Sequence, residues 1–232
     1  MALFDESHLP PETTLELLHG VNAIIARLRG KPVKEIVLPE GLRVPNLVRG
    51  YLQAHLRRML TFLDGGLAEY AAGRPLMTEL ATRAIYENVA SLCDFIDKLK
   101  PLCEAVDYAG IGEHVTKAAF VTRIPSFLEI SKGEDLKAPN ILNQIDRMTK
   151  RYSAFREAYD HLSDIVHPNG LGAVVYFAKI PGDSLISFVD DAVTPERAIH
   201  SLFVAAFLLA FVEIEMDAAE TALKKVVEAI TS

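Results

Sequence analysis

The residues best able to do chemistry gather in one short segment, Tyr159 to Gly170, which reads YDHLSDIVHPNG. Imidazole exchanges protons near neutral pH, so His161 and His167 are candidates for general acid or base catalysis. An arginine beside them, Arg156, could stabilise the negative charge of a phosphate in a transition state. Arg156, His161 and His167 are therefore the candidate catalytic residues.

The spacing of these residues decides which of them share one face of a helix. A polar stripe on that helix comprises Arg156, Asp160, Ser163 and His167. At 3.6 residues per turn, its members fall within about 40° of one direction, whereas His161 lies about 140° from Arg156. Arg156 and His161 can therefore meet only across a partner helix. The stripe members Asp160 and Ser163, with Asn169 just beyond the helix, are candidate binding residues.

The same segment also has a purely structural explanation. Pro168 cannot continue a helix and Gly170 permits a left-handed turn, so His167 is placed to bond carbonyl groups freed at the helix end. This explanation predicts a His167 imidazole that is mostly buried and hydrogen-bonded. It also predicts that His161 is a solvated helix residue and that Arg156 forms an ion pair one turn away.

A second polar stripe lies earlier in the chain, where Glu79, Arg83 and Glu87 recur at every fourth position. If this stripe faces solvent, it forms a ladder of weak salt bridges. If it faces inward, Arg83 and Glu87 meet Arg156 or His167, and they are candidate binding residues for that reason.

The elements that must position these residues are predicted to be helices. The strongest pattern is an uninterrupted apolar seam with the spacing 4-3-4-3-4-3-4, which predicts one long helix from Pro139 to His167. Its members are Ile141, Ile145, Met148, Tyr152, Phe155, Tyr159, Leu162 and Val166. Further helices are expected over residues 12–29, over 46–71 with Asn46 as the cap, and from Arg74 to about 100, followed by short ones over 101–108 and 112–121.

Two β-prone runs, Ala173–Ala178 and Ser184–Val189, flank a Pro-Gly-Asp turn and predict a β-hairpin. A final helix starts at Thr194-Pro195-Glu196, and its first half is apolar all round, which indicates a central helix. The predicted fold is mainly α, with the hairpin inserted before the last helix. It forms one domain over 1–232: helix and connector 1–45, bundle core 46–170, hairpin 171–194 and C-terminal helix 195–232.

Composition restricts the classes of protein to consider. Half of the residues are hydrophobic and the net charge is −7, which argues against broad nucleic-acid binding. The N-terminus lacks a signal-peptide pattern, and the apolar stretch Leu202–Val212 is shorter than the roughly 20 residues of a membrane span. Two cysteines without metal-ligand spacing are expected to be free thiols in a cytoplasmic protein. We expect no cofactor, no metal and no membrane partner.

Charge is unevenly distributed along the chain. The range 27–58 is basic and the range 183–220 is acidic. These two ranges are expected to complement each other, within one chain or between two. A phosphate-binding surface is the alternative.

Two stretches, RPLMTELATRAIYENVASLCDFID and ILNQIDRMTKRYSAFREAYDHLSDIVHPNGLG, resemble an uncharacterised group of bacterial helical proteins related to the HEPN-like fold. The resemblance covers roughly Arg74 to Gly172. It implies a homodimer and a metal-independent ribonuclease of the defence or toxin type, with RNA as partner. Arg156 to His161 matches the Arg-to-His spacing of such sites, although Glu157 stands where Asn, His or Asp is usual. The rival hypothesis is a non-catalytic interaction or sensor protein.

Overall fold

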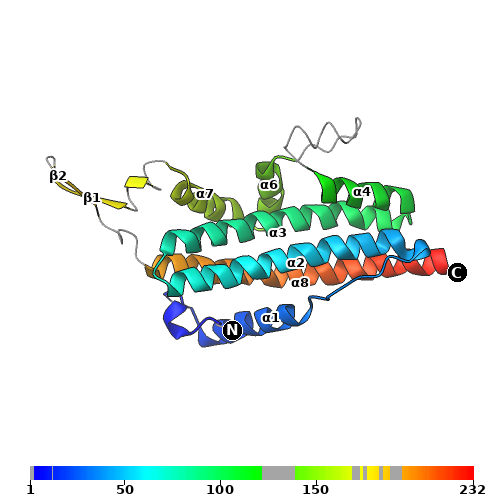
Figure 1. Cartoon of the computed structure of the whole chain (residues 1–232), viewed down its shortest axis with the longest axis horizontal. Helices are drawn as coiled ribbons and strands as arrows, with labels where there is room; N and C mark the ends of the chain where they lie inside the picture. Colours follow the sequence, from blue (N-terminus) through cyan, green and yellow to red (C-terminus); the bar gives the residue numbers. More distant parts are fainter. Residues whose placement is uncertain are drawn as a thin grey trace.

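Long helices make up most of the computed structural model, which describes residues 3–11, 13–121, 139–168, 173–174, 177–182, 185–188 and 195–232 (Figure 1). The helices are α1 (Leu15–Gly30), α2 (Arg43–Ala71), α3 (Pro75–Glu104), α4 (Tyr108–Phe120), α6 (Ile141–Arg151), α7 (Phe155–Val166) and α8 (Pro195–Thr231). Short 3-10 turns cover Glu6–His8 and Glu40–Leu42. The expected mainly α fold is confirmed.

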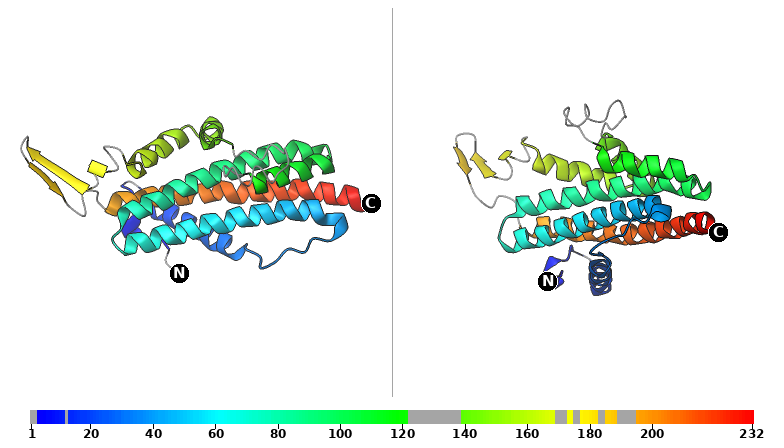
Figure 2. Two further views of the ribbon diagram at one scale, coloured as in Figure 1. Left: turned by 45° about the horizontal axis from the view of Figure 1, so that its top comes forward. Right: turned by 45° about the vertical axis from the view of Figure 1, so that its right-hand side comes forward.

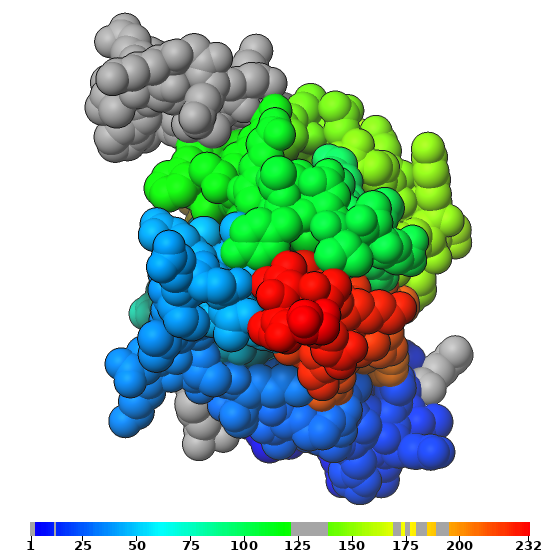
Figure 3. All heavy atoms as spheres, turned by 90° about the vertical axis from the view of Figure 1, so that its right-hand side faces the viewer, coloured from blue at the N-terminus to red at the C-terminus, as the bar shows by residue number. Residues whose placement is uncertain are grey.

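Three long helices, α2, α3 and α8, lie side by side along the long axis and contact one another (Figures 1 and 2). Helix α1 packs on α8, while α4, α6 and α7 pack on α3. At one end of the bundle the last turns of α8 lie between α4 and the N-terminal segments, and α8 contacts the turn at Glu40–Leu42 (Figure 3). The candidate residues of α7 lie toward the other end, where α8 begins.

Helix α8 is the central helix that its composition predicts. It buries a broad face, which includes Ile199, Phe203 and Val212, because α1, α2 and α3 pack against it. Val204 and Ile214, on the remaining side, are exposed. By length and composition it could also cross a membrane, with a mean hydropathy of 1.9 over an 18-residue window, of which 56% is buried in the bundle. A core helix of a bundle is apolar for the same reason. The window is longer than the stretch Leu202–Val212 considered from the sequence.

Side-chain caps mark the starts of three helices. Thr14, Asp107 and Asn140 accept a backbone N–H in the first turns of α1, α4 and α6, as good N-caps do. The predicted cap Asn46 is wrong, because α2 already starts at Arg43 and the Asn46 amide instead donates to the Val37 carbonyl at 2.7 Å.

The predicted helix end near residue 100 is also wrong. Helix α3 continues through Pro101 to Glu104, and the separate short helix over 101–108 does not form. Burial of Leu99 and Cys103 on the same side holds this last turn against the core. The chain then turns at Val106, which has a φ of 51°, and α4 begins.

The predicted long helix over 139–167 is broken into α6 and α7. The break lies at Tyr152–Ala154, where the Tyr152 backbone is extended and its side chain is 44% exposed. Both helices still present apolar residues to the same core, for example Ile145 from α6 and Phe155 from α7. The apolar spacing therefore continues across a break that it does not reveal.

The hairpin before α8 is confirmed, with shifted bounds. Strand β1 (Ala178–Gly182) pairs antiparallel with β2 (Leu185–Phe188), and Ala178 lies opposite Phe188. Ala173 and Val174 lie in a helical turn and not in the first strand. Within the described residues this is the sole sheet, and it projects beyond α7 (Figure 1).

The basic and acidic ranges complement each other within one chain, as expected. Arg27 bonds Glu213 at 2.7 Å, and Arg49 bonds Glu220 through two nitrogens at 2.7 and 2.9 Å. Lys31 also reaches Glu213, at 3.3 Å. Glu213 and Glu220 interrupt the apolar spacing of α8. Both are paired with cations, and these pairs join α1 and α2 to α8.

Candidate functional site

Arg156 is held by carboxylates on the outside of the bundle. Its Nε donates to Asp160 at 2.7 Å, and its Nη1 donates to Asp146 of α6 at 2.5 Å. The predicted ion pair of Arg156 with Asp160 is thus confirmed. No contact joins Arg156 to His161 in the described part of the chain, so the predicted Arg-to-His pair is not assembled within one molecule.

His161 is exposed, as expected for a solvated helix residue, but it contacts a residue from another helix. Arg197, in the first turns of α8, donates from Nη2 to His161 Nε2. Because guanidinium can only donate, this bond leaves Nε2 without a proton and assigns the proton of the neutral ring to Nδ1. The cation that His161 meets within the chain is therefore Arg197.

His161 and Arg197 line a pocket of about 440 Å³ between α7 and α8. Its other lining residues are Pro10, Pro11, Tyr86, Ala158, Leu162, Glu196, His200, Ser201 and Val204. The α8 members recur at helical spacing, so one face of that helix supplies a guanidinium, an imidazole and a hydroxyl to one space.

The electrostatics of the pocket favour a neutral His161. Partial burial lowers its pKa, and the nearby positive charge of Arg197 lowers it further, whereas Asp164 acts in the opposite direction. A neutral imidazole at neutral pH can accept a proton, which is the property that a general base requires.

Behind this pocket lies a carboxylate that the sequence did not single out as buried. Glu79 of α3 is 0% exposed, and neither of its oxygens has a hydrogen bond of ordinary geometry among the described residues. Burial raises the pKa of the Glu79 carboxyl to about 7, although Arg197 and Ser201 lower it in part. Glu79 therefore changes charge near neutral pH beside the arginine that contacts His161.

The remaining members of the second stripe behave differently from Glu79. Arg83 forms an ion pair with Glu87 at 3.1 Å, and both contact the Tyr159 hydroxyl, at 3.3 Å from Arg83 Nη2 and 3.0 Å from Glu87 Oε1. They face α7, as the inward alternative required, but their partner is Tyr159 and not Arg156 or His167. This cluster fixes α7 on α3. The exposed-ladder interpretation is wrong for Glu79.

The prediction that the His167 imidazole is buried is wrong. His167 is exposed. Among the described residues near this end of α7, Ile165 is the buried one, and Leu76 and Val166 pack against it. Its backbone N–H ends the helix by donating to the Ser163 carbonyl at 3.0 Å.

Ser163, another predicted binding residue of this segment, is not among the residues that line the pocket. The Ser163 hydroxyl is buried without a hydrogen bond in the described part of the structure. Asn169 lies outside the described residues.

Four features of the pocket were not predicted from the sequence: Arg197, His200, Ser201 and the burial of Glu79. The spacing of the first three residues placed them on one helix face, and this was the signal available. The apolar residues around them instead predict that this part of α8 is packed in the core. Nothing local marks Glu79 as different from Glu87.

Comparisons of the chain with protein-family models, curated proteins and solved structures find no match. Among the described residues, no three His, Cys, Asp or Glu side chains converge as ligands of a metal ion would.

Proposed function

We propose that the pocket between α7 and α8 is the active site of a metal-independent ribonuclease of the HEPN-like type. The observation that carries the proposal is that two histidines and an arginine, His161, His200 and Arg197, line one pocket. Two imidazoles supply a base and an acid, and a guanidinium supplies the positive charge that a phosphodiester transition state needs.

The proposed reaction is internal transesterification of single-stranded RNA. The phosphate displaces His161 from the Arg197 guanidinium, which binds the phosphate oxygens and frees His161 Nε2. His161 then accepts the proton of the ribose 2′-hydroxyl, and the 2′-oxygen attacks phosphorus. The bond to the 5′-oxygen breaks, and protonated His200 donates a proton to that leaving oxygen. The products are a 2′,3′-cyclic phosphate and a free 5′-hydroxyl.

Glu79 acts in this scheme as a positioning residue behind Arg197. Its carboxyl attracts the guanidinium when ionised and releases it when protonated, with the change centred at a pKa of about 7. The rate of cleavage is therefore expected to depend on pH through Glu79 as well as through His161.

Homodimerisation offers a different arginine for the same chemistry. The HEPN-like resemblance implies that Arg156 reaches His161 across two chains. In the single chain, Arg156 is already bonded to Asp146 and Asp160. Separate substitutions of Arg156 and Arg197 distinguish the two arrangements, because only the arginine that binds the phosphate is needed for cleavage.

The test is cleavage of an end-labelled single-stranded RNA by the full-length protein in the presence of EDTA. His161→Ala, His200→Ala and Arg197→Ala are each expected to slow cleavage by about 100-fold or more, the usual contribution of such groups. His19→Ala is the matched control, since His19 is an exposed helical histidine of α1 outside the pocket. RNA left intact by the unsubstituted protein, or cleavage unaffected by all three substitutions, would overturn the proposal.

A second candidate is a non-catalytic interaction or sensor protein of the same fold. It is favoured by the charge distribution, because Arg27, Lys31 and Arg49 are bonded to carboxylates of α8 and do not form an open cationic surface for RNA. Intact RNA together with saturable binding of a protein or small-molecule partner would favour this candidate.

A further inference from the structure

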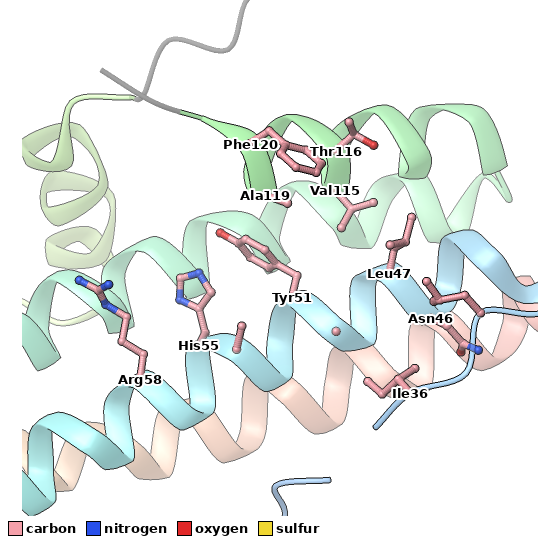
Figure 4. A pocket seen from close by; sticks show the side chains of 13 residues that line it. Ile36, Asn46, Leu47, Tyr51, His55, Arg58, Val115, Thr116, Ala119 and Phe120 are labelled. Carbon is pink, nitrogen blue, oxygen red and sulfur yellow. The ribbon is translucent and has the colours of Figure 1, made fainter. Parts of the chain in front are cut away.

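A second pocket, separate from the α7–α8 site, opens between α2, α4 and the connector that precedes α2 (Figure 4). It has a volume of about 490 Å³, within the range of roughly 300–1,000 Å³ that small-molecule sites occupy. It is lined by Ile36, Leu38, Asn46, Leu47, Gly50, Tyr51, Ala54, His55, Arg58, Val115, Thr116, Ala119 and Phe120.

This second pocket, called the groove below, is apolar along most of its length. Leu47 and Tyr51 of α2 face Val115 and Phe120 of α4 (Figure 4). Ile36 lines the pocket on the side of the connector. Asn46 and Arg58, which mark its two ends on α2, are twelve positions apart, and this corresponds to about 18 Å along the helix. This length suits an extended alkyl chain.

One end of the groove is polar and positively charged. Arg58 is exposed, its guanidinium carbon lies 5.0 Å from the centre of the Phe62 ring, and it forms no ion pair in the described part of the chain. The neighbouring arginine Arg57 instead donates to the Val33 carbonyl. Arg58 is thus available to an anion at this end.

His55 lies beside Arg58 on the same face of α2 (Figure 4). Its Nδ1 is buried and has no hydrogen-bond partner among the described residues, which leaves its hydrogen-bonding capacity unused. Burial lowers the pKa of His55 to about 4, despite a contact with Asn88 that raises it, so the ring is neutral near pH 7. A neutral imidazole can donate one hydrogen bond without adding charge.

We propose that this groove binds one free, long-chain monocarboxylate, with its alkyl chain along Leu47, Tyr51 and Phe120 and its carboxylate at Arg58 and His55. A single cation with one neutral hydrogen-bonding group matches a single carboxylate. A nucleotide or polyphosphate would place several charges at one guanidinium. A peptide would bring backbone polar groups into the apolar part, where the Asn46 side chain already bonds Val37 and Arg49.

Gly50 provides a way to close the groove without disturbing the fold. A Cβ added at Gly50 meets no atom within 4 Å, and Gly50 lines the groove. Gly50→Leu therefore puts a side chain into the ligand space, and it also replaces a poor helix former with a good one. Gly65→Leu is the matched control, since Gly65 lies in the same helix with equally open space but outside the groove.

The experiment is calorimetric titration of the full chain with monomeric dodecanoate. We expect binding of one dodecanoate per chain, loss of that binding in Gly50→Leu and unchanged binding in Gly65→Leu. Arg58→Gln is expected to weaken binding by about tenfold, the effect of losing a charged hydrogen bond, whereas Arg43→Gln on the same helix has no effect. Dodecanol should bind more weakly than dodecanoate, and octanoate more weakly again, by about fourfold for each buried methylene removed.

Three results would overturn the assignment. They are no saturable binding of dodecanoate, equal binding in Gly50→Leu and Gly65→Leu, and equal affinity for dodecanol and dodecanoate. Circular dichroism of each variant verifies that the helices are retained. The result is independent of RNA cleavage, because no groove residue belongs to the α7–α8 pocket.

Discussion

Buried carboxylates have opposite surroundings in two regions of the same bundle. Where α6 crosses α3 and α8, Asp94 bonds Lys98 at 2.8 Å and Arg147 at 2.5 Å. In the same region Glu215 bonds Lys100 at 2.8 Å and also Arg151. Near the start of α8, Glu79 of α3 is more deeply buried than Asp94 or Glu215. Its oxygens have no hydrogen bond of ordinary geometry among the described residues.

The pKa values of these groups follow from that difference. Burial raises the pKa of Asp94 and Glu215, but the hydrogen bonds from lysine and arginine outweigh burial and hold both pKa values below normal. For Glu79 burial dominates, and its pKa rises to about 7. A buried carboxylate contributes to stability where hydrogen bonds from cations outweigh the cost of burial, as at Asp94 and Glu215. It opposes folding where burial outweighs the attraction of a nearby cation, as at Glu79 beside Arg197.

The groups around each buried carboxylate indicate whether it stabilises the fold or belongs to a functional site. Asp94 and Glu215 join α6 to the long helices, and this accounts for their burial. Glu79 forms no ion pair among the described residues, and it lies behind a pocket that contains Arg197 and His161. Strongly perturbed titratable groups beside a pocket are typical of functional sites, and Glu79 is in this position.

The largest predicted effect concerns Glu79. Its folded pKa is raised from 4.5 to about 7, so the native state binds the proton more tightly, and stability is lost as pH rises through that interval. Glu79→Gln removes this loss and is expected to increase the free energy of unfolding by on the order of 3 kcal/mol at about pH 8. Urea unfolding measures the difference.

The same pair of proteins at about pH 5 supplies the control, because Glu79 is then protonated and the two should differ by less than about 1 kcal/mol. A Glu79→Gln variant that is less stable than the unsubstituted protein at high pH would show that Glu79 is a paired carboxylate like Glu215.

Glu215→Gln should have the opposite sign. It removes the negative charge that Lys100 and Arg151 share, and hydrogen bonds to charged groups contribute about 1.5–3 kcal/mol, so we expect a loss of about 2 kcal/mol at neutral pH. Because the pKa of Glu215 is lowered, its contribution is present above the normal carboxyl pKa and disappears as pH falls through the folded value. Glu228→Gln, an exposed position on α8, is the control and should be neutral. A Glu215→Gln variant as stable as that control would contradict this prediction.

The smallest effects are expected for the two histidines of α7. His161 and His167 are both exposed, so each alanine variant should change the free energy of unfolding by less than about 0.5 kcal/mol. Thermal and urea unfolding verify this, and a larger loss in His167→Ala would restore a structural role at the helix end. Unchanged stability also makes His161→Ala a clean variant for the cleavage assay.

The fold class, the hairpin before the last helix and the pairing of the basic and acidic ranges could be predicted from the sequence. Each of these rests on a local or statistical signal. Apolar residues at helical spacing define α2, α3 and α8, a proline in the first turn starts α8, and carboxylates at Glu213 and Glu220 in an apolar seam require cations. Helix periodicity also placed His161 and Arg156 on different faces.

Tertiary structure alone decided which residues meet. The break at Tyr152 leaves the apolar spacing intact, because α6 and α7 pack on one core in different directions, and spacing records only the buried face. The contact of His161 with Arg197 joins positions 36 residues apart in the chain. The burial of Glu79 depends on α8 lying over it, whereas Glu87, two turns along the same stripe, remains partly exposed. Such contacts arise from helices distant in sequence, so no local pattern contains them.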